Sequence, residues 1–156
     1  HQMQVKVNGI PVSGAVKTDK GYWMIQRSWQ PDDTVSCEME MEPERVYAHP
    51  MVRADAGCVA LRRGPIIYTF EGVDNGEDLQ TLRIPREAKI EALPYQADLL
   101  EGIVALRVTG CRKKTAVNPA LYAEDAAPEE VVTLQAIPYY AWCNRGMTHM
   151  RVWMQE

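Results

Sequence analysis

Apolar and polar residues alternate most regularly in the middle of the chain. In residues 66–71, the apolar Ile66, Tyr68 and Phe70 fall on one side of an extended backbone, and the other three residues fall on the opposite side. A period of two indicates a β-strand. A similar apolar run precedes it, and the Gly-Pro pair at 64–65 joins the two runs. Because proline cannot donate to a ladder and glycine tolerates unusual dihedral angles, we expect a bend, a bulge or a sheet corner there.

Residues 34–42 show the same alternation over a longer stretch. One face is mostly acidic, and the other carries Val35, Cys37, Met39 and Met41. One buried and one solvated face are typical of an antiparallel sheet, so we expect these four side chains in the core. Catalytic carboxylates come in pairs across a cleft, whereas these glutamates line one face, which favours a solvated surface.

Turn signals divide the chain into many short strands. Asn8-Gly9 supplies the two positive φ angles of a type I′ turn, which predicts a hairpin over residues 4–12, and Pro11 marks its second arm as an edge. Residues 95–101 are the only plausible helical turn. Further strands are expected at residues 21–27, 82–85, 89–93, 102–109, 131–137 and 150–154. About ten short strands and no long amphipathic helix predict an all-β fold, an antiparallel β-sandwich of jelly-roll or immunoglobulin-like kind.

Two stretches interrupt this pattern. Residues 112–130 lose all periodicity and are too long for a tight connection, so we expect an irregular surface loop or insertion there. Residues 74–78 are acidic and could be read as a calcium site, because hard oxygen ligands suit that ion. The EF-hand spacing is absent, however, and a solvated turn is the favoured interpretation.

Composition and charge narrow the class of protein. At 156 residues, with 46% hydrophobic content, the chain is long enough for one core, which predicts a single domain over residues 1–156. A net charge of −4 at pH 7 gives no basic footprint, which argues against nucleic acid or an anionic membrane as a partner. No apolar run is long enough to span a bilayer, and the first residues enter a strand pattern without a signal core. We therefore expect a soluble C-terminal piece of a larger protein, whose compartment the sequence does not indicate.

The residues alone offer no catalytic constellation. His49 and His149 lie far apart with no serine motif between them, which gives no support to a hydrolytic triad. Cysteine spacings match no zinc ribbon or finger, so buried, inert thiols are the main expectation, with a disulfide or a metal as the alternative. The four cysteines are Cys37, Cys58, Cys111 and Cys143.

Three blocks of sequence together span nearly the whole chain. The first runs from Gly21-Tyr22 through Arg27 and Trp29 to Asp33, Val35 and Met41. The second runs from Gly57 through Arg63-Gly64-Pro65 to Tyr68, Glu71 and Asp74-Asn75. The third runs from Ala136-Ile137-Pro138 through Tyr139, Tyr140 and Trp142 to Asn144-Arg145-Gly146, Met150 and Trp153. In order and approximate spacing, these blocks resemble the C-terminal β-sandwich region of the β-L-arabinofuranosidase-type glycoside hydrolases, family 127.

The resemblance implies an accessory region rather than an active site. Members of the family place an (α/α)6 barrel ahead of the sandwiches, and that barrel carries a zinc bound by a glutamate and three cysteines. One cysteine acts as the nucleophile of a retaining mechanism, since a metal-bound thiolate can attack a sugar carbon. The corresponding Glu-x-Cys and Cys-Cys motifs are missing from this sequence. We therefore expect no catalytic residue, no metal ligand and no cofactor in this chain, and expect the zinc in the barrel.

The remaining candidate site is a surface that contacts the barrel or the rim of its active site. Aromatic residues and arginine dominate interface hot spots. Our candidates are Tyr139, Tyr140, Trp142, Asn144 and Arg145. The expected partner is the catalytic barrel of the same polypeptide, with a homodimer through the same face as a further option. The alternative is that these are ordinary core and corner residues.

A second hypothesis belongs to a different functional class. Sugar rings stack on flat aromatic side chains, so the chain could be a carbohydrate-binding module with carbohydrate as its partner. The rings available for such a platform are Trp23, Trp29, Tyr140, Trp142 and Trp153.

Overall fold

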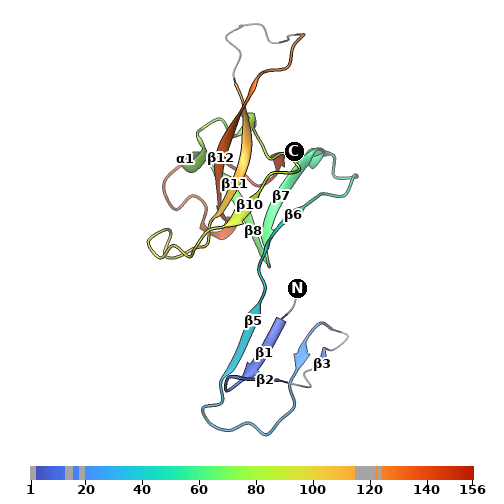
Figure 1. Cartoon of the computed structure of the whole chain (residues 1–156), viewed down its shortest axis with the longest axis vertical. Helices are drawn as coiled ribbons and strands as arrows, with labels where there is room; N and C mark the ends of the chain where they lie inside the picture. Colours follow the sequence, from blue (N-terminus) through green and yellow to red (C-terminus); the bar gives the residue numbers. More distant parts are fainter. Residues whose placement is uncertain (1–2, 13–15, 18–19, 115–121, 123) are drawn as a thin grey trace. The chain divides into compact units, whose positions relative to one another are not determined.

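The chain forms two compact units, residues His1–Met41 (unit 1) and Glu42–Glu156 (unit 2). The computed structural model describes residues 3–12, 16–17, 20–114, 122 and 124–156. Figure 1 shows the strands of both units. Where the sequence predicted a single domain over residues 1–156, the strands of each unit pair only among themselves within the described residues. Each group of strands therefore forms its own compact body.

Unit 1 begins with the predicted hairpin. Asn8 and Gly9 have φ angles of 51° and 77°, so both occupy the left-handed region that a type I′ turn requires. The strand order β2-β1-β5 places β2 at the edge, as Pro11 predicted. The strands of this unit are β1 (Met3–Val7), β2 (Ile10–Pro11), β3 (Val16–Lys17), β4 (Trp23–Met24) and β5 (Val35–Met39).

The β1–β5 pair has one apolar and one polar face. Directly opposite residues share a face, and the apolar one is formed by Met3 with Met39, Val5 with Cys37, and Val7 with Val35. On the other face, Lys6 and Glu38 form an ion pair of 2.6 Å. We call the first of these the apolar face of unit 1. Its β5 half is not buried, because Val35 and Met39 are 45% and 57% exposed.

The expectation of a buried face on residues 34–42 is therefore wrong for β5. Alternation separates the two faces of a strand, but it does not say whether another layer covers either of them. Among the described residues of unit 1, only Val5 and Val7 are buried apolar side chains. Cys37 is exposed as well, and so is Cys143, whereas Cys58 is buried as predicted. All four cysteines are free thiols.

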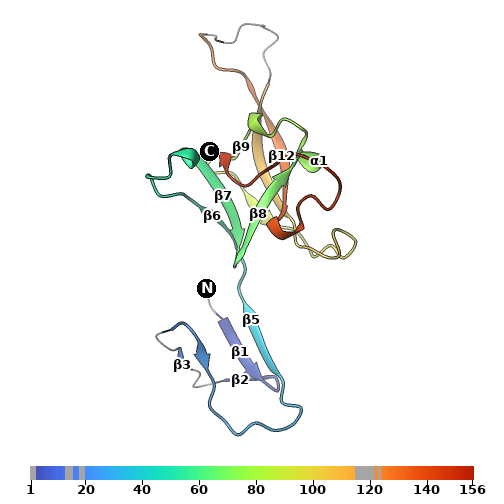
Figure 2. The same cartoon turned by 180° about the vertical axis from the view of Figure 1, so that it is seen from behind.

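Unit 2 is built on one large sheet that returns on itself. Its elements are β6 (Pro43–Val46), η1 (Arg53–Asp55), β7 (Cys58–Arg63), β8 (Ile66–Glu71), α1 (Gly72–Asn75), η2 (Leu79–Thr81), β9 (Leu82–Arg83), β10 (Ile90–Ala92), β11 (Leu106–Lys113), β12 (Glu129–Pro138), η3 (Tyr139–Ala141), β13 (Met150–Arg151) and β14 (Met154–Gln155). The strand order is β13-β8-β12-β11-β9-β14-β7-β6. β8 also pairs with β7, and Figure 2 shows the hairpin that these two strands form. All pairs are antiparallel except β14 with β9. The predicted all-β, antiparallel class is confirmed.

The core of unit 2 lies inside this curled sheet. The central sequence stretch supplies much of it, since Val59, Leu61, Tyr68 and Phe70 are almost fully buried. Gly64, with φ of 58°, and Pro65 connect β7 to β8 in a tight hairpin, where the sequence predicted a bend, a bulge or a sheet corner. A second, smaller cluster joins residues near the ends of β11 and β12 to the loop after β10: Ile103, Ala105, Ile137 and Ala141, with Leu93, Leu99 and Leu100.

Several predicted boundaries change in the structure. The ends of the predicted loop 112–130 are strand, because β11 and β12 pair as far as Lys113 and Glu129, while residues 115–121 and 123 lie outside the described part. Residues 95–101 form turns rather than a helix, and the short helices lie elsewhere. The predicted strand 21–27 shrinks to β4. In the described chain, no helix is long and apolar enough to cross a membrane.

Candidate functional site

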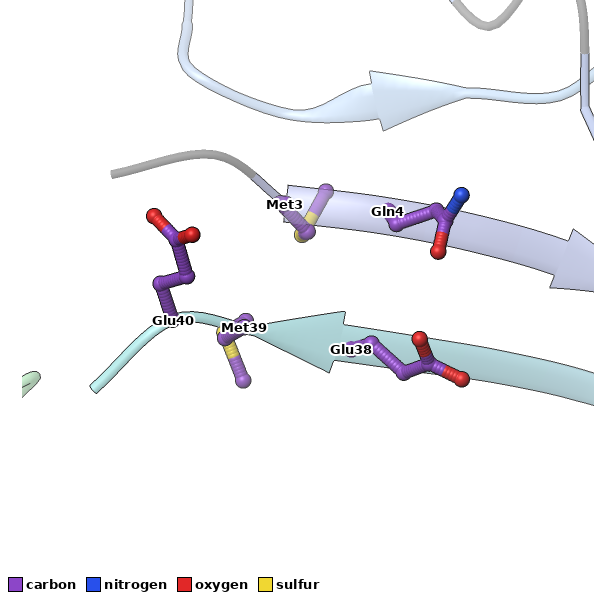
Figure 3. Close-up of a pocket in the computed structure, with 5 residues that line it drawn as sticks. All are labelled: Met3, Gln4, Glu38, Met39 and Glu40. Carbon is purple, nitrogen blue, oxygen red and sulfur yellow. The ribbon is translucent and has the colours of Figure 1, made fainter.

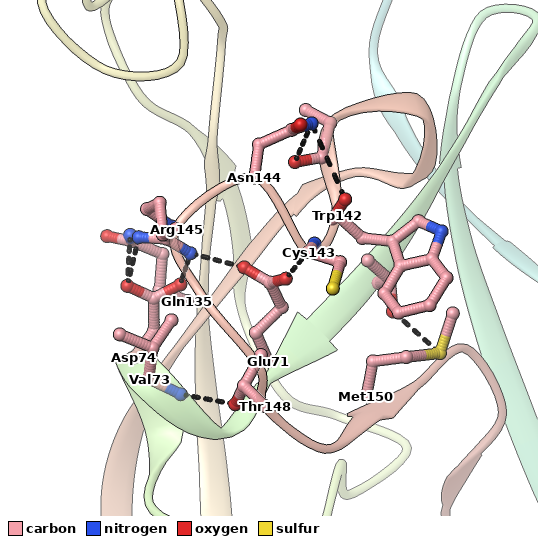
Figure 4. Close-up of polar contacts among 12 residues, drawn as sticks. Glu71, Val73, Asp74, Gln135, Trp142, Cys143, Asn144, Arg145, Thr148 and Met150 are labelled. Carbon is pink, nitrogen blue, oxygen red and sulfur yellow. Dashed lines mark hydrogen bonds and ion pairs between the residues drawn. The ribbon is translucent and has the colours of Figure 1, made fainter.

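The candidate residues lie on η3 and the loop that follows it, between β12 and β13. This segment is residues 139–149, and Figure 4 shows its part from Trp142 to Thr148 beside Glu71 at the end of β8 and Asp74 in α1. We call it the aromatic loop. It carries all five residues that the sequence singled out.

Arg145 connects the aromatic loop to the end of β8 and to α1 through two carboxylates. Its Nη2 donates to Glu71 Oε2 at 2.6 Å, and its Nη1 donates to Asp74 Oδ1 at 2.8 Å. A third bond joins Nη2 to Asp74 Oδ2 at 2.5 Å (Figure 4). Glu71 is only 1% exposed, so its charge is compensated inside the protein. We call these three residues the Arg145 clamp.

The electrostatics of the clamp favour a permanently charged guanidinium. Hydrogen bonds, first to Asp74 and then to Glu71, raise the pKa of Arg145 above its ordinary value, although partial burial acts in the opposite direction. Both carboxylates are therefore engaged by one cation and are not set across a cleft as a catalytic pair.

A second fastening uses the backbone. Cys143 has a φ of 63°, in the left-handed region, and its N–H donates to Glu71 Oε1 at 2.7 Å. The Asn144 side-chain amide donates to the Ala141 carbonyl at 3.1 Å, which closes the turn. Asn144 Nδ2 and the two Arg145 Nη atoms thus bind acceptors within the chain.

Asn75 ties the clamp to the central sheet. Its Nδ2 donates to the carbonyls of Glu71 and Gln135, both at 2.9 Å, and its Oδ1 accepts from the Gln135 N–H at 2.8 Å. Asn75 is 5% exposed. The prediction of a solvated turn at residues 74–78 is therefore wrong for Asp74 and Asn75, because their partners come from β12 and the aromatic loop, some sixty to seventy residues away.

The loop presents three rings to solvent. Tyr139, Tyr140 and Trp142 are 45%, 66% and 36% exposed, so none of the three is a core residue, while the alternative that they are corner residues stays a prediction. The rings of Tyr139 and Trp142 have centroids 6.4 Å apart and are tilted by 35°, so they form no flat platform together. Whether this surface meets a barrel or a substrate rim stays a prediction.

A shallow depression adjoins Tyr139. Its volume is about 560 Å³, and it is lined by Ile67, Tyr139, Met150, Arg151, Val152 and Trp153. We call it the β8–β13 depression. Of the five rings proposed as a carbohydrate platform, only Trp153 lines it, and Trp23 and Trp29 belong to unit 1. The Trp29 ring is also covered by the Arg27 guanidinium, 5.2 Å from its centroid.

Sequence reasoning missed Glu71, Asp74 and Asn75 as members of the site. The available signal was that two of the three resembling blocks contain the partners, Glu71 with Asp74-Asn75 in one and Arg145 in the other. The clamp is the point where these two blocks meet. Among the described residues, no three His, Cys, Asp or Glu side chains lie close enough to hold a metal ion.

Comparison with known proteins gives a consistent result. The sequence profile of the glycoside hydrolase family 127 C-terminal domain matches residues 43–155, almost the bounds of unit 2. The non-reducing end beta-L-arabinofuranosidase of Bifidobacterium longum subsp. longum is 35% identical over 96% of the chain. The match spans 23% of that protein.

Solved structures agree over both units. A GH127 beta-L-arabinofuranosidase from Geobacillus stearothermophilus T6 matches the whole chain with a TM-score of 0.86 and 45% identity, and the match covers 25% of that protein. A GH127 beta-arabinofuranosidase matches 99% of the chain with a TM-score of 0.80 and 33% identity, over 23% of its own length. The chain thus spans about a quarter of the length of these relatives.

Proposed function

Because the chain belongs to glycoside hydrolase family 127, we propose that it is a non-catalytic accessory region that packs against and supports a separate catalytic part of a β-L-arabinofuranosidase. Residues 43–155 are the C-terminal domain of that family, and the relatives are glycoside hydrolases. The catalytic (α/α)6 barrel, its zinc and a retaining mechanism belong to this proposal and lie outside these residues.

The observation that carries the proposal is the apolar face of unit 1. Its β5 residues are exposed, although they alternate as regularly as those of a buried strand. At one end of the β1–β5 pair, Met3 and Met39 face each other across the strands and line a cavity of about 490 Å³ with Gln4, Glu38 and Glu40 (Figure 3). Exposed apolar side chains gathered on one face of a strand, here Val35 and Met39, mark an interaction site. The rest of a longer polypeptide is the partner we propose for it.

The test compares two neighbouring residues on opposite faces of β5 in the full-length enzyme. Val35→Glu places a charge on the apolar face, and Ser36→Glu places the same charge on the polar face. We expect Val35→Glu to lower the melting temperature by about 5 °C or more, because burying an unpaired carboxylate costs several kcal/mol. Ser36→Glu is expected to change it by less than about 1 °C.

The 156-residue chain alone provides the control. Both side chains are exposed in it, so there both variants are expected to melt like the parent chain. If Val35→Glu and Ser36→Glu behave alike in the full-length enzyme, the apolar face of unit 1 is not covered there and the packing proposal is wrong.

A further inference from the structure

The outer face of β8 is covered along part of its length and open at one residue. Ile67, Thr69 and Glu71 alternate onto this face. Thr69 is buried and donates through Oγ1 to the Arg151 carbonyl at 3.0 Å, and Glu71 is buried in the Arg145 clamp. Ile67 remains 37% exposed. The β8–β13 depression is this uncovered part of the face.

The depression combines an apolar floor with free polar groups. Ile67 and Val152 contribute aliphatic surface, and Tyr139 and Trp153 contribute aromatic rings. The Tyr139 hydroxyl, the Trp153 indole N–H and the Arg151 guanidinium form no hydrogen bond or ion pair with any residue that the structure describes. Small-ligand sites are typically apolar with a few convergent polar groups, and this volume lies within their usual range of about 300–1,000 Å³.

The walls of the depression are held in place. Tyr139 belongs to η3, whose Ala141 is buried in the second core cluster, and the loop beyond it is fastened by the Arg145 clamp. On the other side, Arg151 pairs with Phe70 across β13 and β8. Groups that are fixed before binding lose less conformational entropy when a ligand arrives.

We propose that the β8–β13 depression binds a pentose residue of a carbohydrate chain. A furanose ring presents C–H groups, which suit the Tyr139 and Trp153 rings, and hydroxyl groups, which can accept from Arg151 and from the indole N–H. Six residues line the depression, which is few for a stable protein interface, since such an interface takes about 20–30 residues on each partner. The identity of the sugar, arabinofuranose, rests on the proposed function, whereas the carbohydrate class rests on the depression itself.

The experiment uses the full-length enzyme and two substrates, a small chromogenic β-L-arabinofuranoside and an arabinofuranose-bearing polysaccharide. Tyr139→Ala and Trp153→Ala are expected to raise KM about tenfold on the polysaccharide with kcat unchanged. Neither variant is expected to alter the kinetics on the small substrate. Migration in native gels that contain the polysaccharide reports binding directly, and we expect weaker retardation of both variants. Trp153→Phe keeps an aromatic ring but removes the indole N–H and the five-membered ring, and it provides a second variant should Trp153→Ala fail to fold.

Tyr140→Ala is the matched control. Tyr140 neighbours Tyr139 on η3 and is more exposed, but it does not line the depression. Equal losses on both substrates for Tyr139→Ala and Tyr140→Ala would identify a protein interface and overturn the proposal. Unchanged KM and unchanged gel retardation for the depression variants would also overturn it. The two proposals can fail separately. If the full-length enzyme is inactive on the small arabinofuranoside, the proposed function is contradicted. If gel retardation still depends on Tyr139 and Trp153 in that case, the carbohydrate site is supported.

Discussion

Arg145 replaces water as the partner of two acidic side chains. Taking Glu71 out of water is costly unless its charge is paired and both oxygens are hydrogen-bonded. Arg145 satisfies one oxygen and the Cys143 N–H satisfies the other. The aromatic loop therefore has a defined conformation although most of its residues are exposed.

Removing the guanidinium tests this role. Arg145→Ala leaves Glu71 buried without its cation and is expected to reduce the free energy of unfolding by about 3 kcal/mol. Arg145→Lys keeps the charge but cannot bind both carboxylates through a planar fork, so we expect an intermediate loss. Urea denaturation of the chain, followed by tryptophan fluorescence, measures both.

Arg62→Ala is the control for Arg145→Ala. Arg62 pairs with Glu44 at 2.8 Å, but its side chain is 46% exposed, and such pairs contribute less than about 1 kcal/mol. Equal losses for the two alanine variants would show that the Arg145 clamp is no stronger than a surface pair.

Single residues were the least predictable part of the molecule. The sequence placed Arg145 on a surface that contacts the barrel or its rim because arginine and aromatic residues dominate interface hot spots. Its partners at 71 and 74 become neighbours only when β8 and the aromatic loop meet. Local pattern carries no information on such a contact. The turn at Asn8-Gly9, by contrast, depends on two adjacent residues and was predicted correctly.

At the scale of elements, one carboxylate links β14 to two other segments. Glu156 Oε1 accepts from the Tyr47 hydroxyl at 2.7 Å, and Oε2 accepts from Arg86 Nη2 at 2.7 Å. These hydrogen bonds lower the pKa of Glu156 from its ordinary value of 4.5, and the bond from Tyr47 has the largest effect. Residues just beyond β6, β9 and β14 are thereby connected.

This linkage predicts a pH dependence of stability. Because the pKa of Glu156 is lower in the folded chain, its contribution is complete above about pH 5.5 and is lost as the pH falls through the folded value. Glu156→Gln lacks this contribution. The difference in unfolding free energy between the parent chain and Glu156→Gln is therefore expected to be constant near neutral pH and to shrink in acid. A difference that grows in acid would contradict the assignment.

The matched control is Glu124→Gln, which alters an exposed carboxylate. Its unfolding free energy is expected to follow that of the parent chain at every pH within about 0.5 kcal/mol.

The positions of strands were easier to predict than which of their faces other segments bury. Alternation located β5, β8 and β12, because the side-chain period follows from backbone geometry alone. It did not reveal that Val35 and Met39 are exposed, since cover depends on segments far away in sequence. The outer face of β8 shows the converse, because polar Thr69 and Glu71 are buried there by the segment 143–151.

At the scale of the whole molecule, the two units differ in the core they contain. Both hydrophobic clusters found among the described residues lie in unit 2. Unit 1 is close to the size, about 40 residues, below which domains usually need disulfides, metals or oligomerisation to fold. The match to the family profile begins at residue 43, close to the boundary between the two units.

Separate fragments are expected to behave differently. Residues 42–156 are expected to unfold cooperatively with a midpoint within about 2 °C of the whole chain, because their core is complete. Residues 1–41 alone are expected to give the circular dichroism of an unfolded chain. A cooperative transition in the shorter fragment, or loss of structure in the longer one, would contradict this division.

The position of β14 has a consequence for biosynthesis. This strand inserts between β9 and β7, and its Met154 pairs with Val59, far earlier in the chain. At about 5–20 residues per second, a ribosome needs some seconds to deliver β14 after β7 has emerged. Throughout that interval the nascent chain carries two unpaired strand edges, which are the surfaces that recruit other unfolded chains. The sheet of unit 2 therefore closes only after residues 154–155 have left the exit tunnel, and protection of the nascent chain by chaperones matters most until then.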